Sequence, residues 1–366
     1  MCMKITRVPM AVAAAVVLGM LGATGAGASS AGTKTPPGHA ARAGAASVPG
    51  AQLWVKRYGN GSVYDANPVL TAASPTGRMV FVTGTSRGTT SGLDYATLAY
   101  NADTGKQLWV TRYNGPANDH DFAQAIAVSP NGGTVFVTGQ SRAGEYMNFA
   151  TVAYDANTGK QLWVKSYSSS AGDNIPHSLA VSPGGGRVFV TGFSSGQYGT
   201  VAYRADTGKR LWLTRYNAPA GQANMARSVV VSPTERKVFV TGSCDGSSDQ
   251  YGNPVGNDYA TVAYDAATGE QQWVTRYDGP GNGNDYANSM AVSPTGQTVF
   301  VTGESPGADH VSGYATLAYN ADTGMQLWLQ RHGHGSASSI AASPRGQVFV
   351  AGGTGTNDYT TIAYGG

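Results

Sequence analysis

The residues best suited to carry out chemistry stand in one recurring context. Asp121 opens the segment DFAQAIAV, Asp285 opens DYANSMAV, and His177 lies inside the similar segment NIPHSLAV. Carboxylates and imidazoles are the side chains that enzymes use most often as general acids and bases. One hypothesis is therefore that Asp121, Asp285 and His177 act as acid–base groups. In the alternative, the two aspartates cap turns and take part in no reaction.

One position in these segments varies although its surroundings do not. When the segments are aligned on the Ser-Pro pair that follows each of them, this position holds Val69, Gln124, His177, Arg227, Asn288 and Ser338. Two places later the residues stay apolar, as in Ile126 and Val229. A ring of mixed polar side chains could bind a sugar or a peptide, or it could be a hydrated opening. The predicted ligand-binding residues are those of the ring and two asparagines just ahead of it: Gln124, His177, Arg227, Asn288, Asn174 and Asn224.

Three further histidines occur near the end of the chain. His332 and His334 form an H-x-H pair, and His310 lies on the loop before them, next to Asp309. Three imidazoles on neighbouring loops could bind zinc or another borderline metal. The alternative is that these glycine-flanked histidines lie on the surface and bind no metal.

The longest loop of the sequence is rich in side-chain oxygens. Asp245, Asp249, Asn253 and Asp258 could hold calcium, although their spacing does not follow the EF-hand pattern and a solvated polar loop is the alternative. Calcium and zinc thus both remain candidate metals. Cys244 at the start of this loop has no cysteine partner once Cys2 is removed, so no intramolecular disulfide is expected.

These residues are positioned by a repeat that runs along most of the chain. Residues 95–113, YATLAYNADTGKQLWVTRY, predict two strands joined by a turn at N-A-D-T-G, and a second phrase, AVSPNGGTVFVTG at residues 127–139, predicts another hairpin. Copies of both phrases alternate along the sequence. One unit therefore has four strands, A to D, over about 50–60 residues, which is the size of a propeller blade.

The number of repeats predicts an all-β fold, a six-bladed β-propeller of four-stranded antiparallel blades. The tryptophans recur at one register in these units: Trp54, Trp109, Trp163, Trp212, Trp273 and Trp328. The repeat region begins with a lone D strand at residues 53–58 and ends with a lone C strand at residues 359–364. Pairing of these two strands would complete the sixth blade and close the ring, which removes exposed sheet edges.

Two of the repeated phrases resemble known families. The run AYNADTGKQLW at residues 99–109 resembles the tryptophan-docking repeat of quinoprotein-type, or PQQ-like, propellers, and SPNGGTVFVTG at residues 129–139 is similar to YVTN-type propeller repeats. The resemblance covers nearly all of residues 51–366 and implies a PQQ-dependent dehydrogenase as one activity. The larger quinoprotein dehydrogenases have eight blades and a vicinal disulfide, which have no counterpart here, so PQQ is disfavoured.

The N-terminus has the features of a secretion signal. Lys4 and Arg7 precede an apolar core at residues 10–21, and residues 26–28 form an A-x-A cleavage site. We expect residues 1–28 to be removed, residues 29–50, rich in Ala, Gly and Pro, to form a linker, and residues 51–366 to form the propeller. Residues 51–366 carry 20 basic and 21 acidic residues. This balance predicts neither a nucleic acid nor an anionic membrane surface as a partner. No membrane insertion is expected, because the apolar run at residues 10–21 is too short to span a bilayer.

The two faces of the predicted propeller differ in variability. The A–B and C–D turns are short and constant, whereas the B–C loops and D–A connections vary and carry five histidines: His120, His177, His310, His332 and His334. Variable loops on a rigid scaffold are the usual place for binding residues. We expect a secreted, monomeric binding or interaction protein that holds a small molecule, glycan or peptide at the channel mouth on this face. The alternatives are a secreted hydrolase or lyase that uses Asp121, Asp285 and His177, and then a PQQ-dependent dehydrogenase.

Overall fold

The computed structural model describes residues 50–59, 69–88, 92–169, 172–218, 224–246, 256–354 and 358–366. In these segments the chain forms 23 β-strands arranged in six sheets. None of the described segments forms a helix that is long and apolar enough to cross a membrane. The predicted secretion signal and nearly all of the predicted linker lie outside the described residues.

The sheets are numbered here as blades 1 to 6 in chain order. Blades 1 to 3 contain β1 (Leu70–Ala73), β2 (Met79–Arg87), β3 (Leu93–Asn101), β4 (Gln107–Tyr113), β5 (Asp121–Val128), β6 (Thr134–Ala143), β7 (Tyr146–Asp155), β8 (Gln161–Tyr167), β9 (Asn174–Val181), β10 (Arg187–Ser194), β11 (Gln197–Arg204) and β12 (Arg210–Tyr216). Blades 4 to 6 contain β13 (Met225–Val231), β14 (Lys237–Asp245), β15 (Asn257–Asp265), β16 (Gln271–Tyr277), β17 (Tyr286–Val292), β18 (Thr298–Pro306), β19 (Ser312–Asn320), β20 (Gln326–His332), β21 (Ser336–Ala342), β22 (Gln347–Gly353) and β23 (Tyr359–Gly365).

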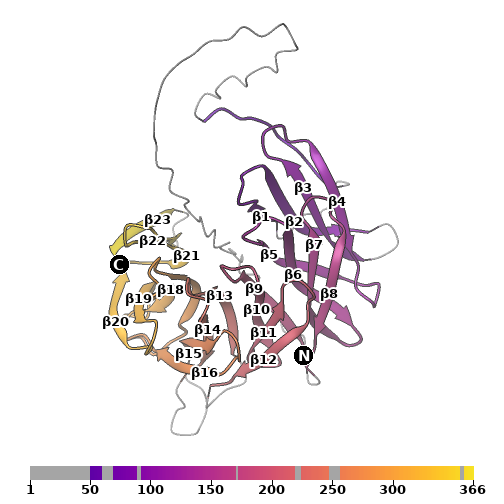
Figure 1. The fold of residues 1–366 in the computed structure, drawn as a ribbon. Coiled ribbons are helices and arrows are strands. Elements are labelled where there is room, and N and C mark those ends of the chain that lie inside the picture. Colours follow the sequence, from indigo (N-terminus) through magenta and orange to yellow (C-terminus); the bar gives the residue numbers. More distant parts are fainter. Residues whose placement is uncertain are drawn as a thin grey trace, which may run out of the picture.

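Each blade is an antiparallel meander whose strands pair in chain order. Blades 1 to 5 have four strands and blade 6 has three. The first strand of each blade from blade 2 onward packs against the first three strands of the blade before it. These first strands lie on the inner side of an arc of blades, and the fourth strands lie on its outer side (Figure 1). The predicted six-bladed, all-β propeller is therefore confirmed.

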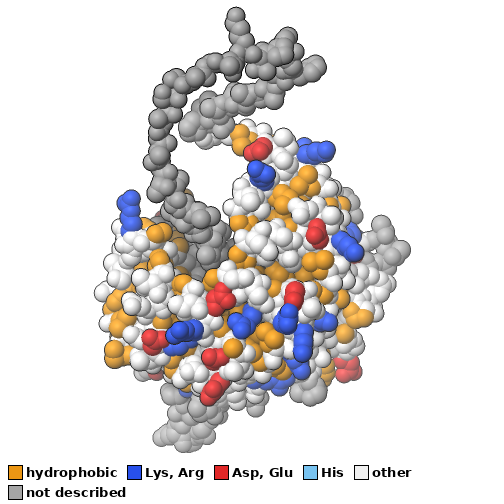
Figure 2. Space-filling model, viewed as in Figure 1, with side chains coloured by type: hydrophobic (Ala, Val, Ile, Leu, Met, Phe, Trp, Pro, Cys, Tyr) orange, Lys and Arg blue, Asp and Glu red, His pale blue; other side chains and the backbone are white. Residues whose placement is uncertain are grey.

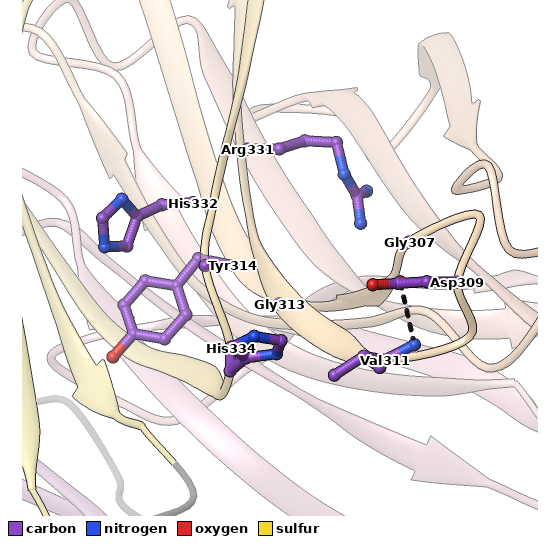
Figure 3. A pocket seen from close by; sticks show the side chains of 9 residues that line it. Gly307, Asp309, Val311, Gly313, Tyr314, Arg331, His332 and His334 are labelled. Atoms are coloured by element: carbon purple, nitrogen blue, oxygen red, sulfur yellow. Dashed lines mark hydrogen bonds between the residues drawn. The ribbon is translucent and has the colours of Figure 1, made fainter.

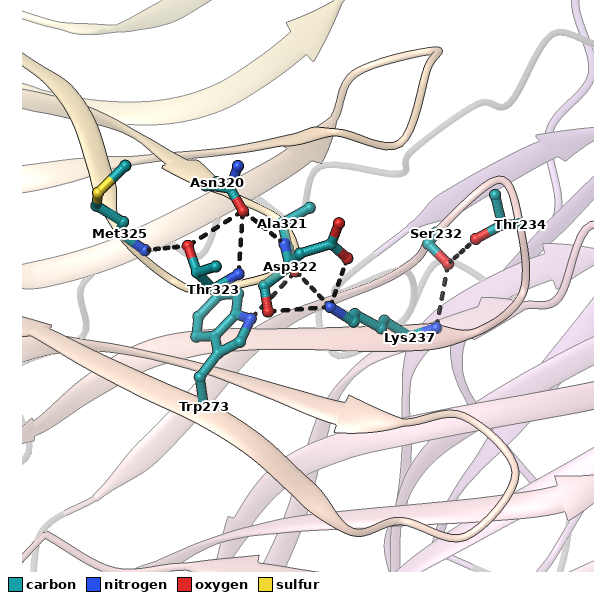
Figure 4. A network of polar contacts seen from close by, with 9 residues as sticks. All are labelled: Ser232, Thr234, Lys237, Trp273, Asn320, Ala321, Asp322, Thr323 and Met325. Atoms are coloured by element: carbon teal, nitrogen blue, oxygen red, sulfur yellow. Dashed lines mark hydrogen bonds and ion pairs between the residues drawn. The ribbon is translucent and has the colours of Figure 1, made fainter.

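The C–D turns of blades 1 to 5 are held by their own polar side chains. In blade 5, Oδ1 of Asn320 accepts hydrogen bonds from the backbone N–H of Asp322 at 2.9 Å and of Thr323 at 3.0 Å (Figure 4). Gly324 follows with a φ of 73°, a region that favours glycine. On the adjoining blade, Lys237 Nζ binds Asp322 Oδ1 at 2.7 Å and so ties β14 to this turn. These hydrogen bonds and the glycine explain why the turn sequence recurs from blade to blade.

Each of these turns also receives the tryptophan of the preceding blade. The Trp273 indole N–H donates to the carbonyl oxygen of Ala321 at 3.1 Å (Figure 4). A Cβ built on Gly324 would come within 2.7 Å of the Trp273 ring, so the indole lies flat against a glycine. The same bond links the other pairs: Trp109 with Ala156, Trp163 with Ala205 and Trp212 with Ala266. Docked indoles therefore join one blade to the next around the arc.

The ring closure predicted from the two lone strands is not formed within the described residues. Residues 53–58 lie in no β-strand, and β23 pairs with β22 alone, so blade 6 keeps three strands. Figure 1 shows blades 1 and 6 at the two ends of the arc. Trp54 nevertheless donates to Ala102 O at 2.7 Å, which is the position that a docked D-strand tryptophan takes. The N-terminal segment is thus attached to blade 1 by this contact, but it does not pair with β23 within the described residues.

The surface in Figure 2 mixes charged and apolar side chains. Leucines that precede the docked tryptophans on the outer strands remain partly exposed, such as Leu108 at 43% and Leu162 at 47%. Singly exposed apolar side chains of this kind are common on soluble proteins. On this face the acidic and basic groups alternate, and no region of one charge stands out (Figure 2).

Candidate ligand site at the channel mouth

The variable position of the sequence coincides with a β-bulge in the first strand of each blade from blade 2 to blade 6. The register between the first and second strands shifts around Gln124, His177, Arg227, Asn288 and Ser338. A bulge leaves its extra residue without a partner in the ladder and redirects its side chain. This explains why the blade framework tolerates a different residue at this position in every repeat. We call these five residues the bulge ring.

Several members of the bulge ring connect one inner strand to the next. His177 Nδ1 lies 2.8 Å from the carbonyl oxygen of Ala226, on the first strand of blade 4. In the same way, Asn288 Nδ2 donates to Ala337 O at 2.9 Å, on the first strand of blade 6. In both cases the hydrogen bond ends on the residue that directly precedes the bulge residue of the following blade. The ring has a structural role in joining the blades, and Gln124 and His177 are buried at 8% and 6% exposure.

Arg227 differs from the other members of the ring. Its side chain is half-buried, its Nε has no hydrogen-bond partner, and it takes part in no ion pair among the described residues. Burial lowers the pKa of the guanidinium, while the neighbouring Tyr286 and Tyr198 oppose this shift. A guanidinium has five N–H donors and stays charged, so one on an inner strand whose Nε has no partner favours an anion.

The two predicted asparagines ahead of the ring are engaged within the protein. Asn224 Nδ2 donates to Gly196 O at 2.9 Å and to Asn217 Oδ1 at 2.8 Å, and its Oδ1 accepts from Ala218 N at 3.3 Å. Asn174 Oδ1 accepts from Ser194 Oγ at 2.9 Å. Their amide groups therefore hold the D–A connections in place, which is the capping role considered as the alternative for these positions.

The three predicted acid–base residues lie on three different blades. Asp121 and Asp285 hold equivalent positions at the entry to blades 2 and 5, where each Oδ2 accepts from a loop glycine, Gly115 at 2.6 Å and Gly279 at 3.0 Å. Burial raises the pKa of both carboxyl groups, and these hydrogen bonds oppose the shift. Burial also lowers the pKa of His177 to about 4, so the imidazole is neutral at pH 7. The structure does not bring the two aspartates to one place, because blades 3 and 4 separate them.

The H-x-H pair lines an open cavity of about 330 Å³ at the end of blade 5. His332, His334, Tyr314, Arg331 and Asp309 all border it (Figure 3). The His332 ring lies edge-on to the Tyr314 ring at a centroid distance of 6.0 Å. Asp309 Oδ1 accepts from the backbone N–H of Val311 at 3.1 Å and so stabilises its own loop.

The predicted three-histidine metal site is not assembled in this cavity. His310 is exposed, has a φ of 59° and is absent from the cavity wall. Among the described residues, three potential ligand atoms of His, Cys, Asp or Glu lie within 4.8 Å of one another only at Asp258, Asp278 and Asp285. His332 and His334 therefore remain two surface imidazoles rather than part of a three-ligand cluster.

That acidic group was missed in part by sequence reasoning. The sequence predicts Asp285 as an acid–base residue and Asp258 as a calcium ligand, but it gives no role to Asp278. Alignment of the repeats could have identified Asp278. It directly follows Tyr277, at the position that Asn114 and Asn217 hold in other blades, so a carboxylate replaces an amide there. Asp245, the first of the predicted calcium residues, lies at the end of β14, and Asp249 and Asn253 lie outside the described residues.

Cys244 is fully buried within the core of blade 4. Burial raises the pKa of its thiol to about 12, so the reactive thiolate is not formed at neutral pH. We expect no reaction of the native protein with Ellman's reagent at pH 8, and one thiol per mature chain to react after unfolding in guanidinium chloride. Stoichiometric labelling of the folded protein would contradict this assignment of Cys244 to the core.

The fold, the docked tryptophans and the bulge ring define a tryptophan-docked β-propeller with PQQ-like repeats. A family model described as "Outer membrane protein assembly factor BamB" matches residues 41–248 and 147–315. Because these matches span well over half of the sequence, the chain belongs to this family. No curated protein matches the chain.

Several solved structures share the fold at low sequence identity. Hydrazine synthase of Kuenenia stuttgartiensis is 13% identical with a TM-score of 0.53, over 77% of this chain and 75% of that one. Chaetomium thermophilum Sqt1, bound to the N-terminus of ribosomal protein L10, is also 13% identical with a TM-score of 0.53, over 79% and 68%. The Dos1 propeller is 12% identical with a TM-score of 0.53, over 80% and 67%. These similarities show the fold alone.

The bulge ring does not fit the cofactor PQQ. This quinone carries three carboxylates, and its binding needs several positively charged groups. Arg227 is the one guanidinium in the ring, and His177 is neutral and bonded to the backbone.

Proposed function

We propose that this protein is a secreted binding protein that holds a small molecule, glycan or peptide at the channel mouth, on the face of the B–C loops and D–A connections. The observation that carries the proposal is Arg227, an unpaired and half-buried guanidinium on the inner strand of blade 4. Secretion follows from the predicted signal at residues 1–28. The rigid blades fix the inner strands, while the bulge position varies from blade to blade, as binding positions on a scaffold do.

The chemistry of the ring selects an acidic group on the ligand. Arg227 can donate two parallel hydrogen bonds to a carboxylate or phosphate, which is the geometry that a guanidinium fits best. Asn288 and Ser338 are half-buried on the next two inner strands and can contact neutral parts of the same ligand. The ligand that the site favours is therefore an acidic peptide, acidic glycan or small carboxylated molecule.

No geometric observation favours the hydrolase or lyase hypothesis over binding. Asp121 and Asp285 belong to different blades, and both accept hydrogen bonds from loop backbone. The His177 imidazole is bonded to Ala226 O and buried. These groups stabilise the channel mouth in the same way that Asn174 and Asn224 do at the equivalent positions.

The proposal is tested with Arg227→Gln, which removes the charge and keeps a side chain that can donate hydrogen bonds. The mature protein is screened on an array of acidic and neutral peptides and glycans, and affinities are measured for the best ligands. We expect acidic members to bind, and Arg227→Gln to weaken them about 10–100-fold, as the loss of a charged hydrogen-bond partner does.

The matched control is Arg204→Gln. Arg204 pairs with Asp206 at 2.5 Å in the C–D turn of blade 3, on the other face of the propeller. This variant carries the same change of charge and is expected to bind as the wild type does. Equal affinity of Arg227→Gln and wild type, or binding of neutral ligands only, would refute an anion site at the channel mouth.

A further inference from the structure

Three aspartates meet where blade 4 adjoins blade 5. Asp258 lies at the start of β15, Asp278 directly follows β16, and Asp285 directly precedes β17. One carboxylate oxygen from each lies within 4.8 Å of the other two. Asp258 and Asp285 are buried at 5% and 0% exposure, whereas Asp278 is exposed. The group is therefore reachable from solvent on one side and enclosed by protein on the others.

Two of these three positions hold amides at the junction of blades 3 and 4. There Asn217 corresponds to Asp278, and Asn224 corresponds to Asp285, because each pair has the same place relative to the paired tyrosine and the bulge. Asn224 Nδ2 donates to Asn217 Oδ1 at 2.8 Å. Carboxylates have no hydrogen to donate when ionised, so Asp278 and Asp285 cannot form this bond. The direct link between the two positions is lost at blades 4 and 5.

The loss leaves buried oxygen atoms without partners. Oδ2 of Asp285 accepts from Gly279 N at 3.0 Å, and hydrogen bonding from the Ser305 hydroxyl also lowers the pKa of this carboxyl group, so that hydroxyl is the one further donor beside its buried Oδ1. Likewise Oδ2 of Asp258 accepts from Arg276 at 2.7 Å, and its Oδ1 is buried and unpartnered. An unsatisfied buried oxygen is costly, and a charged one more so. Among the described residues the Asp258 oxygen thus has no partner at all, and the buried Asp285 carboxylate has few donors for its charge.

Two guanidinium groups lie near the cluster but do not complete it. Arg276 is bonded to Asp258 and to the backbone oxygen of Asp245. Arg331 donates to Tyr277 Oη at 2.5 Å and to Ser305 Oγ at 2.6 Å, and its charge acts on Asp285 from a distance. Three carboxylates against two guanidiniums leave a net negative charge, and neither arginine bonds an unpartnered oxygen. A cation can therefore still be accommodated.

We propose that Asp258, Asp278 and Asp285 bind a calcium ion that links blade 4 to blade 5. Oxygen-only ligands select a hard cation, and calcium accepts flexible arrangements of carboxylates with water completing the shell. Calcium–oxygen distances of about 2.3–2.6 Å place opposite ligands about 4.6–5.2 Å apart, so three oxygens within 4.8 Å can reach one ion. The site is separate from the channel-mouth ligand and does not depend on it.

The blade 1–blade 2 junction shows which residue distinguishes the site. Asp94 and Asp121 correspond to Asp258 and Asp285, but Asn114 stands where Asp278 does. Asn114 Nδ2 donates to Asn118 Oδ1 at 2.6 Å. Asp278 is thus the residue that adds a third carboxylate, and it is exposed enough to be replaced without loss of the core.

The test uses the mature, untagged protein after dialysis against EDTA and then calcium-free buffer. Calcium chloride is titrated in by calorimetry, and Tm is measured with and without 10 mM calcium. We expect one calcium ion per chain with Kd of about 0.1–1 mM, the range of extracellular calcium modules. We expect Tm to rise by about 2–4 °C on addition of calcium. Asp278→Asn is expected to fold, because it restores the amide of the other junctions, and to lose both responses.

The control is Asp103→Asn, which removes one exposed carboxylate from the C–D turn of blade 1 on the other face. It should retain the calcium heat and the rise in Tm. The proposal is overturned if the wild type shows no calcium heat and no change in Tm. It is also overturned if Asp278→Asn responds to calcium as the wild type does, since the ion would then bind at a site that does not include Asp278.

Discussion

Replacing Trp212 with alanine is expected to lower the free energy of unfolding by about 3–5 kcal/mol, the range of buried Trp-to-Ala substitutions. The indole is 8% exposed and packs against Phe189 and Tyr264 at centroid distances of 5.7 and 6.3 Å. Its N–H donates to Ala266 O at 3.1 Å across the boundary between blades 3 and 4. The substitution therefore opens a cavity and also leaves a carbonyl oxygen without its donor.

The measurement is equilibrium unfolding in urea, with Leu211→Ala as the matched control. Leu211 is the neighbour of Trp212 on β12, has no partner on β11 because of a bulge at this point, and is 39% exposed. An exposed leucine has little packing to lose, so we expect a change within about 0.5–1 kcal/mol. A loss for Trp212→Ala no greater than for Leu211→Ala would show that the docked indoles do not hold the blades together.

The blades could be predicted from sequence because each is built from local signals. The turn around Asn320 combines a side chain that accepts backbone hydrogen bonds with a glycine at positive φ, and both are visible in the repeated phrase. The tryptophan register is also local, since each indole docks on a turn of the next repeat. Strand alternation and these two signals predict the order of the strands and the number of blades.

Ring closure depends instead on two segments more than 300 residues apart. The pattern of residues 53–58 predicts a strand, and the docking of Trp54 on Ala102 agrees with its predicted place. Pairing with β23 requires the two ends of the arc to meet. Neither the sequence of residues 53–58 nor that of residues 359–364 shows whether they do. For this reason the sequence could predict a closed ring while the described residues leave blade 6 with three strands.

The candidate sites also combine features that the sequence shows with features that depend on the folded structure. The variable column could be found by alignment of the repeats, but its cause, a β-bulge, depends on the pairing of two strands. The cluster of Asp258, Asp278 and Asp285 combines a strand start with both ends of a connection between blades. No single spacing in the sequence places the three oxygens together. The histidines are the opposite case. His310 lies on a neighbouring loop in the sequence, but the structure does not bring it together with His332 and His334.

Acidification is expected to destabilise the protein through His177. Burial lowers the pKa of this imidazole to about 4, whereas an unfolded histidine has a pKa of about 6.5. Between these two values the unfolded chain binds a proton that the folded chain does not. The stability contributed by the neutral imidazole is therefore fully present above pH 6.5 and is lost as the pH falls towards 4. A difference of about 2.5 pKa units corresponds to about 3 kcal/mol.

The quantity to measure is the pH dependence of the free energy of unfolding in the wild type and in His177→Gln. Subtraction of the two removes other titrating groups, such as Asp258, whose pKa is raised to about 6 by burial and which acts in the opposite direction. We expect the difference between wild type and variant to shrink by about 3 kcal/mol from pH 7 to pH 4. Parallel pH curves would mean that His177 is solvated and free to titrate. Its hydrogen bond to Ala226 O would then not hold blade 3 against blade 4, and an imidazole at the channel mouth would again be available for acid–base chemistry.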